Sequence, residues 1–229
     1  MSDTAAIPSR LIPPSVAPTA RTTSTSDATS FTGGKYYCSY NQVHNLCQQA
    51  AKRIREDKFQ PDIILAVAGG GLIPARMLRT HLKVPIRTVS LELYDDRTNK
   101  AGSCVRTTQW IDREEICNKR VLIVDEVDDS RTTLAFCVSQ VRQMSPSQLG
   151  IFVVHNKQKV KKCNSHWKSV GFQENCDCSS NGNNSDHQST SIDYYRSGED
   201  LSDRWIVYPW DSTDIDNHTK CAEQVTVTH

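Results

Sequence analysis

The sequence has no apolar run that approaches the roughly 20 residues needed to span a bilayer, and its N-terminal residues lack the apolar core of a secretory signal. It also lacks an excess of charge, because 27 Lys and Arg residues stand against 26 Asp and Glu residues and give a formal net charge of +1. No overall field therefore favours nucleic acid or an acidic membrane. These absences predict a protein that binds neither nucleic acids nor membranes.

A motif of the form G-x-x-x-x-G-K-[ST] is absent too, which argues against a P-loop ATPase. Structural disulfides are not expected, because the nine cysteines form an odd set and several, such as Cys47 and Cys137, fall inside helical or strand patterns. Reduced thiols are typical of a cytoplasmic compartment. With 229 residues, the chain has room for one domain and its appendages.

Two segments lack a sustained apolar period. Residues 1–34 are rich in Ser, Thr, Pro and Ala, and we expect a disordered tail there, with an organelle-targeting segment as the alternative. Residues 163–200 are dense in Ser, Asn, Asp and Cys, and we interpret them as a flexible polar insertion. Zinc binding in that insertion is an alternative, although its Cys and His spacings do not match structural zinc sites. The ordered domain is expected over 35–229.

The most informative stretch runs from Val121 to Leu134. It begins with four apolar residues, which predict a strand buried on both faces, as in a parallel sheet. Carboxylates follow, at Asp125, Glu126, Asp128 and Asp129. A hydroxyl-rich turn, Ser130–Thr133, then opens a helical pattern. Ligands of open parallel sheets bind beyond the carboxyl ends of the strands.

At that edge, carboxylates suit hydroxyl groups or a metal, whereas hydroxyls and free helix N–H groups suit a phosphate. A sugar phosphate with vicinal hydroxyls satisfies both requirements. A solvated acidic turn after a core strand is the alternative interpretation.

A second strand pattern, 63–68, leads directly into Gly69-Gly70-Gly71 and a helix that we expect to open at Pro74. Backbone N–H groups in such a turn are unobstructed and can approach an anion. Three glycines alone also fit a simple tight turn. The spacing is not G-x-G-x-x-G, so a dinucleotide site is not expected. Next to the acidic strand end, the turn becomes the candidate for a second phosphate site.

Further strand patterns occur at 86–93, 105–111 and 149–155, which completes the expectation of an α/β fold. The polar residues 94–104 form either a surface loop or a mobile lid. Lysines follow the strand at 149–155, and we attribute most of them to solubility. Lys157 is the exception, because it stands nearest to the ligand-binding edge.

Residues 203–211 end the ordered pattern with an aromatic strand, a proline and Asp211, in a chain with only 7% aromatic residues. A planar side chain beside a sugar-phosphate site can stack on a heterocyclic base. A core role is the alternative, in particular for Trp210.

Taken in order, four motifs resemble those of the type I phosphoribosyltransferase family, in its purine branch, and most closely the fungal hypoxanthine-guanine and xanthine members. The similarity covers about 36–162 and 194–222, and four motifs in the right order are highly specific. They are the pyrophosphate loop at 69–74, the phosphoribosyl pyrophosphate (PRPP) motif at 121–134, the base-recognition strand at 152–157 and the hood at 203–211.

The resemblance implies an α/β, type I phosphoribosyltransferase fold: a central, mostly parallel sheet flanked by helices, with a small hood that includes the polar insertion at about 163–200. It implies transfer of 5-phosphoribosyl from PRPP to N9 of hypoxanthine, guanine or xanthine, with release of pyrophosphate and inversion at the anomeric carbon. It further implies purine salvage, Mg²⁺ as cofactor, and a homodimer or homotetramer.

The resemblance also implies roles for individual residues in binding PRPP. Asp125 and Glu126 are expected to bind the ribose 2- and 3-hydroxyls. Hydroxyl and backbone N–H groups of the turn are expected to hold the 5-phosphate, at Ser130, Arg131, Thr132 and Thr133. Gly69 and Gly70 are expected to approach the pyrophosphate, across a non-proline cis peptide after Ala68.

For the base and the metal, the resemblance assigns a second set of residues. Asp129 is expected near the purine N7 as proton acceptor or donor, with Lys157 donating to the 6-oxygen. Trp205 is expected to stack on the base while the Ile206 backbone reads the position-2 substituent. The expected metal ligands are Asp125, Glu126 and Asp211.

Three positions depart from patterns within the family. Many members have glycine where Arg131 stands, bacterial xanthine-guanine enzymes have arginine where Gly69 stands, and proline is usual where Ser202 stands. A regulatory protein that senses PRPP without catalysis is a rival, but it needs neither a stacking tryptophan nor a donor to the 6-oxygen. A phosphoribosyltransferase for a pyrimidine or adenine is another rival.

Overall fold

The computed structural model describes residues 34–95, 100–162 and 192–226. The expected disordered tail, up to residue 33, and the expected insertion over 163–191 therefore lie outside the described residues. So does the centre of the expected lid, at 96–99.

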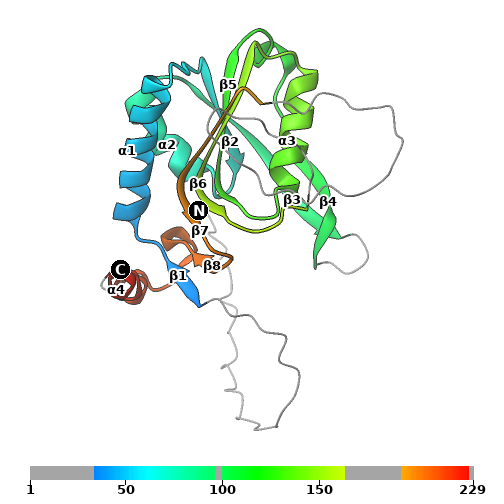
Figure 1. Cartoon of the computed structure of the whole chain (residues 1–229). Helices are drawn as coiled ribbons and strands as arrows, with labels where there is room; N and C mark the ends of the chain where they lie inside the picture. The colour runs from blue at the N-terminus through cyan, green and yellow to red at the C-terminus, as the bar shows by residue number, and fades with distance from the viewer. Residues whose placement is uncertain (1–33, 96–99, 163–191, 227–229) are drawn as a thin grey trace, which may run out of the picture. The chain divides into compact units, whose positions relative to one another are not determined.

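The main sheet has six strands in the order β4-β3-β2-β5-β6-β7 (Figure 1). All neighbouring strands are parallel except β3 and β4, which are antiparallel. The mostly parallel sheet expected from the sequence is confirmed. The strands are β2 (Ile63–Ala68), β3 (Ile86–Asp95), β4 (Lys100–Gln109), β5 (Arg120–Asp128), β6 (Gln148–Lys157) and β7 (Tyr194–Leu201).

Helices cover both faces of this sheet (Figure 1), and each face has its own apolar cluster. Side chains alternate between the two clusters along each central strand, as strand geometry requires. In β2, Ile63 and Leu65 pack towards α3, whereas Ile64 and Ala66 pack towards α1 and α2. The helices are α1 (Tyr40–Glu56), α2 (Leu72–Leu82) and α3 (Thr132–Gln143). A short 3₁₀ turn, η1 (Arg113–Glu115), precedes β5.

Helix α1 begins with a capping box, as the sequence predicts. The Ser39 hydroxyl accepts from the Gln42 N–H at 3.2 Å, and the Gln42 side chain accepts from the Ser39 N–H at 2.7 Å. Two N–H groups that the helix itself leaves without a partner are thereby satisfied. The apolar stripe that includes Val43, Cys47 and Ile54 is fully buried.

A small second sheet pairs the first and last strands of the described chain. β1 (Lys35–Tyr37) and β8 (Trp205–Val207) run parallel, with Tyr36 opposite Ile206. The 3₁₀ turn η2 (Pro209–Asp211) and helix α4 (Ile215–Thr226) follow β8. Together, β1, β8, η2 and α4 form the part of the chain that we call the hood.

Strand β7 corrects the extent assigned to the polar insertion. Residues 194–200 were expected inside it, but they belong to β7, which pairs with β6 at the edge of the main sheet. Tyr194 and Tyr195 give this strand an apolar beginning, and the residues after them are polar or small up to Leu201 at its end. Edge strands tolerate such a pattern because one side of the strand has no neighbour in the sheet. Gly198 is needed because a Cβ there would meet the Val154 carbonyl oxygen at 2.7 Å.

Other boundaries also differ from the expectation. Residues 94–95 and 100–104 of the expected loop or lid belong to β3 and β4, which pair with each other. β5 does not end where its carboxylates begin but continues to Asp128, because its later residues still pair with β6. Helix α2 begins at Leu72, two residues before Pro74. A proline in the first turn is compatible with this start, since the N–H it lacks has no partner inside the helix.

Candidate functional site

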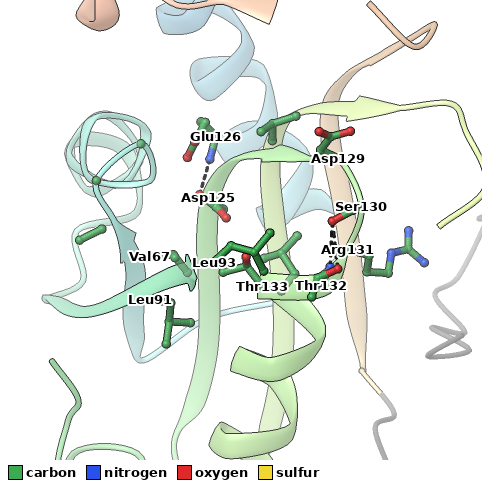
Figure 2. A pocket seen from close by; sticks show the side chains of 15 residues that line it. Val67, Leu91, Leu93, Asp125, Glu126, Asp129, Ser130, Arg131, Thr132 and Thr133 are labelled. Carbon is green, nitrogen blue, oxygen red and sulfur yellow. Dashed lines mark hydrogen bonds between the residues drawn. The ribbon is translucent and has the colours of Figure 1, made fainter. Parts of the chain in front are cut away.

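A cavity of about 350 Å³ opens at the carboxyl edge of the main sheet (Figure 2). It lies between the end of β2, the end of β5 and the first turn of α3, with Leu91 and Leu93 of β3 on a further side. The structure thus gathers most of the residues expected to bind PRPP around one space. Those that line it are Gly69, Gly70, Asp125, Glu126, Asp129, Ser130, Arg131, Thr132 and Thr133.

The acidic end of β5 forms one wall of the cavity. Asp125 is buried, and its carboxylate accepts the Glu126 N–H at 2.9 Å. Burial, reinforced by the neighbouring Glu126 charge, raises the pKa of Asp125 well above its ordinary value. One carboxylate oxygen of Glu126, Oε2, is buried without a hydrogen-bond partner. This wall therefore offers oxygens that a cation or a hydroxyl donor can satisfy.

The glycine turn forms the wall next to Glu126 and must be free of side chains. A Cβ on Gly70 would collide with the Glu126 carboxylate, so glycine is required for the two walls to approach each other. The peptide bond between Ala68 and Gly69 is cis, as expected from the resemblance.

The turn before α3 presents hydroxyl and N–H groups to the cavity. The Ser130 and Thr132 hydroxyl oxygens lie 3.0 Å apart, and the Thr132 N–H donates to the Ser130 hydroxyl at 3.4 Å (Figure 2). Arg131 has a left-handed backbone, with φ of 67°. Glycine adopts that conformation most easily, which fits the glycine common at this position in the family that the sequence resembles. The turn and the helix start together suit a phosphate group.

The Arg131 side chain does not point into the cavity with its backbone (Figure 2). Its guanidinium is buried and donates to the Asp128 carboxylate at 2.9 and 3.1 Å. The Tyr195 hydroxyl donates to the same carboxylate at 3.0 Å. Sequence reasoning gave Asp128 no role and missed this cluster. The short spacing between Asp128 and Arg131 could have indicated their ion pair. Nothing in the sequence indicated that Tyr195 of β7 also contacts Asp128.

Asp129 and Lys157 come together from different strands. Lys157 Nζ lies 3.3 Å from Asp129 Oδ1, and Lys159 Nζ also pairs with that oxygen. Burial alone would raise the pKa of Asp129, but the two ammonium groups outweigh it and lower the pKa. Asp203 lies 3.1 Å from Lys159 Nζ and 3.9 Å from Lys157 Nζ, so it completes a network of alternating charges.

Four residues expected at the site do not line the cavity: Lys157, Trp205, Ile206 and Asp211. Trp205 is 67% exposed on β8 and is free to meet a planar ligand. Burial raises the pKa of Asp211, and the Glu126 charge adds to this shift. Trp210 stacks on Tyr208 with ring centroids 4.6 Å apart, so the core alternative describes it better.

Within the described residues, no group of three or more His, Cys, Asp and Glu side chains is arranged to hold a metal ion. No helix in that part of the chain is long and apolar enough to cross a membrane. The zinc alternative at 163–191 falls outside the described residues.

The carboxyl edge of this mostly parallel sheet places carboxylates beside a hydroxyl-rich turn at a helix start, an arrangement in an α/β protein that suits a sugar phosphate. Residues 39–194 match the model of the phosphoribosyl transferase domain family. The chain belongs to this family.

Two relatives from Saccharomyces cerevisiae are similar over most of their lengths. Hypoxanthine-guanine phosphoribosyltransferase is 38% identical, with 82% of this chain and 90% of the relative covered. Xanthine phosphoribosyltransferase 1 is 35% identical, with 82% of this chain and 95% of the relative covered.

Two solved structures share the fold. A protein from Neisseria gonorrhoeae, crystallised with bound ppGpp, superimposes with a TM-score of 0.67 and 34% identity, covering 84% of this chain and 98% of the other. Purine phosphoribosyltransferase from Pyrococcus horikoshii superimposes with a TM-score of 0.55 and 26% sequence identity, covering 79% of this chain and 95% of the other.

Proposed function

We propose that this protein is a purine salvage phosphoribosyltransferase. It transfers 5-phosphoribosyl from PRPP to N9 of a 6-oxopurine, which is hypoxanthine, guanine or xanthine, and it releases pyrophosphate. The observation that carries this proposal is the shared cavity, in which Asp125 and Glu126 face the same space as the Ser130–Thr133 turn. Relatives named for hypoxanthine-guanine and xanthine support the choice of base.

In this proposal, each wall of the cavity binds one part of PRPP. Asp125 and Glu126 accept hydrogen bonds from the ribose hydroxyls, and the turn Ser130–Thr133 holds the 5-phosphate through hydroxyls and N–H groups. Arg131 takes part through its backbone, because its side chain is committed to Asp128. Gly69 and Gly70 leave room for the pyrophosphate beside them.

The residues present fit a magnesium ion, which is a hard cation that prefers oxygen ligands. Glu126 has a buried oxygen without a hydrogen-bond partner. Burial, followed by the Glu126 charge, raises the pKa values of Asp125 and Asp211, and a bound cation would offset both effects. We assign Asp125, Glu126 and Asp211 to this ion. The described carboxylates do not by themselves form a three-residue metal site, so PRPP oxygens and waters would complete the coordination. When bound, the ion supplies charge neutralisation for the departing pyrophosphate.

For the base, the proposal uses the pair Asp129 and Lys157. Lys157 donates to the 6-oxygen, and Asp129 exchanges a proton with N7. The lowered pKa of Asp129 keeps its carboxylate ionised and able to accept that proton. Trp205 stacks on the purine, while the Ile206 backbone contacts the position-2 substituent. The exposed Trp205 ring suits this role because a base can cover it.

The chemical step proceeds with inversion at the anomeric carbon. The bond to pyrophosphate loosens first and leaves an oxocarbenium-like ribose, which N9 attacks from the opposite side. Rate enhancement comes mainly from holding both substrates in line, and the fixed dipoles of the phosphate turn add to it. We further infer one phosphoribosyltransferase domain at 35–229, a cytoplasmic location, and a homodimer or homotetramer.

A turnover assay tests the proposal directly. Purified protein is mixed with PRPP and Mg²⁺, and each of hypoxanthine, guanine and xanthine is supplied separately, with adenine and orotate as comparison bases. We expect nucleotide and pyrophosphate to form in equal amounts with at least one 6-oxopurine. Binding of PRPP without turnover of any base would contradict catalysis and favour a PRPP-sensing protein. Turnover of adenine or orotate alone would contradict the choice of base.

A further inference from the structure

Lys161 lies just beyond β6, in a segment that passes beside the phosphate turn. Its ammonium nitrogen is within hydrogen-bonding distance of four oxygens. Three of them are main-chain carbonyls, those of Asp128 at 2.6 Å, Asp129 at 3.1 Å and Lys157 at 2.8 Å. The fourth is the side-chain oxygen of Asn156 at 2.9 Å.

These contacts join the ends of two neighbouring strands. Asp128 and Asp129 stand at the end of β5, whereas Asn156 and Lys157 stand at the end of β6. An ammonium group has three hydrogens, so at least one of them is shared between two oxygens. One side chain thus connects the main chains of both strands where their hydrogen-bond ladder stops.

The Lys161 ammonium group is mostly buried and is surrounded by protein oxygens. The side chain is only 10% exposed, and its Nζ also lies 3.5 Å from the Asp128 carboxylate. Burial lowers the pKa of Lys161, although the Asp128 charge opposes that shift. Hydrogen bonds to several oxygens offset part of the cost of removing an ammonium ion from water. A lysine serving solubility alone would keep its head group in solvent.

The other lysines of this segment have different surroundings. Lys159 pairs with the carboxylates of Asp129 and Asp203. The Lys162 side chain is exposed, and the residue contacts the turn only through its backbone N–H, which donates to the Ser130 carbonyl at 3.1 Å. Lys161 alone among these three bonds to the backbone of both Asp129 and Lys157.

We propose that Lys161 is a positioning residue for the transfer reaction, because it bonds to the main chains of Asp129 and Lys157 and holds these two residues at their working separation. The inference rests on the proposed function. Lys161 does not line the cavity, so it acts through its neighbours and not by touching PRPP. The 3.3 Å contact between Asp129 and Lys157 is the distance that it maintains.

The central test compares Lys161→Gln with Lys162→Gln. Both variants lose one positive charge from the same segment, but only the first loses the link between the strands, since the Lys162 backbone bond stays in place. We expect Lys161→Gln to lower kcat by about 10- to 100-fold, the size of effect that small misplacements of reacting groups produce. The KM for PRPP should change by less than kcat, and Lys162→Gln should resemble the wild type.

A second measurement separates positioning from a purely structural role. Asp129 faces the ammonium groups of Lys157 and Lys159, which in turn face Asp203. If the pair loosens, the pKa of Asp129 rises and the acidic limb of the kcat/KM profile moves to higher pH, in Lys161→Gln and also in Lys161→Arg, which keeps the charge beside Asp129. A loss of stability alone would lower the active fraction and leave the position of that limb unchanged. Thermal unfolding of each variant accompanies the kinetics.

Lys161→Arg provides a second variant that keeps the charge. Its branched head group cannot direct three hydrogens from one point at the same oxygens, so we expect a folded protein with kcat reduced by about 3- to 10-fold. The inference is overturned if folded Lys161→Gln or Lys161→Arg has the kcat and the acidic limb of the wild type. An inactive wild type would overturn the proposed function as well, so the two failures are distinguishable.

Discussion

Tyr208 donates its hydroxyl hydrogen to the main-chain carbonyl of Glu126 at 2.9 Å, and so joins the hood to the acidic end of β5. The same hydroxyl lies 2.8 Å from Nδ1 of His155, a fully buried residue of β6. The Tyr208 hydrogen is used in the bond to Glu126. The 2.8 Å contact is therefore a hydrogen bond only if Nδ1 of His155 carries a hydrogen and donates it to the Tyr208 oxygen. One hydroxyl of the hood therefore contacts both Glu126 and His155.

Tyr208→Phe removes that hydroxyl and leaves a buried carbonyl and a buried ring N–H without their partner. Each unsatisfied buried group costs about 1–3 kcal/mol, so the loss of both bonds should lower the free energy of unfolding by about 2–6 kcal/mol. Urea unfolding at neutral pH measures it. Tyr40→Phe is the matched control, because the Tyr40 side chain is 43% exposed, and it should be near neutral. Equal effects of the two substitutions would mean that the link to Glu126 contributes nothing.

Local patterns in the sequence predict much of this site. The apolar run before Asp125, the hydroxyls after Asp129 and the capping box at Ser39 are each encoded within a few neighbouring residues, and the structure has all three features. Gly70 was also identifiable, although its steric reason, the Glu126 carboxylate, comes from another strand.

Contacts between distant segments account for what the sequence did not reveal. Strand β7 has a polar pattern and stands directly after the polar insertion, so nothing in its own residues separated the two. The partner of Asp128 from that strand, Tyr195, was hidden for the same reason. Lys161 looked like its neighbours because the oxygens it bonds to are mostly main-chain atoms, which have no signature in the sequence.

Asp129→Asn tests the proton transfer assigned to this carboxylate. The substitution keeps the shape of the side chain but removes its ability to accept a proton, so kcat should fall by about 10²- to 10⁴-fold. Binding of PRPP, measured by calorimetry, should stay near that of the wild type. Asp203→Asn is the control, because Asp203 faces the same lysines without lining the cavity. Unchanged turnover in Asp129→Asn would remove Asp129 from this role.

The pair of Asp62 and Arg120 predicts a dependence of stability on pH. Hydrogen bonds from the Arg120 guanidinium, at 2.6 and 3.1 Å, and from its backbone N–H, at 2.8 Å, lower the pKa of Asp62 below its ordinary value of 3.8. A carboxyl whose pKa is lowered in the folded state stabilises the protein above its unfolded pKa, and this contribution is lost as the pH falls through the folded pKa.

We therefore expect Asp62→Asn to be less stable than the wild type at pH 7, with a difference that shrinks as the pH is lowered below about 4. Urea unfolding at a series of pH values follows both proteins. The exposed pair of Lys52 and Glu56, at 3.8 Å, supplies the control Glu56→Gln, which should have a smaller effect at pH 7. A difference for Asp62→Asn that is constant with pH would contradict the prediction.

Trp205→Ala tests whether the exposed ring meets the base. Removal of the stacking surface should raise the KM for the purine more than the KM for PRPP, by a factor of about 10, which corresponds to roughly 1.4 kcal/mol. Trp205→Phe retains an aromatic ring and should recover part of the loss. If the two KM values rise equally in Trp205→Ala, the tryptophan supports the fold of the hood and does not contact the base.

Arg131→Gly tests which contributes more to stability at this position, relief of backbone strain or the buried ion pair with Asp128. Arg131→Gly would relieve a left-handed residue, a gain of about 1–3 kcal/mol, but it would also leave the buried Asp128 carboxylate without its guanidinium. Breaking a buried pair on one side costs about 3–5 kcal/mol, so we expect net destabilisation. Denaturant unfolding of the wild type and Arg131→Gly at pH 7 shows whether the free energy of unfolding falls or rises.

Two further variants test whether loss of the ion pair with Asp128 causes the destabilisation of Arg131→Gly. Lys83 also has a left-handed backbone, with φ of 61°, but its side chain is exposed, so Lys83→Gly should be neutral or stabilising. Adding Asp128→Asn to Arg131→Gly removes the stranded charge and keeps an oxygen for the Tyr195 hydroxyl. The double variant should therefore be more stable than the sum of the single effects predicts, by about 0.5–3 kcal/mol. Simple additivity would mean that Arg131 stabilises the phosphate turn through contacts other than Asp128.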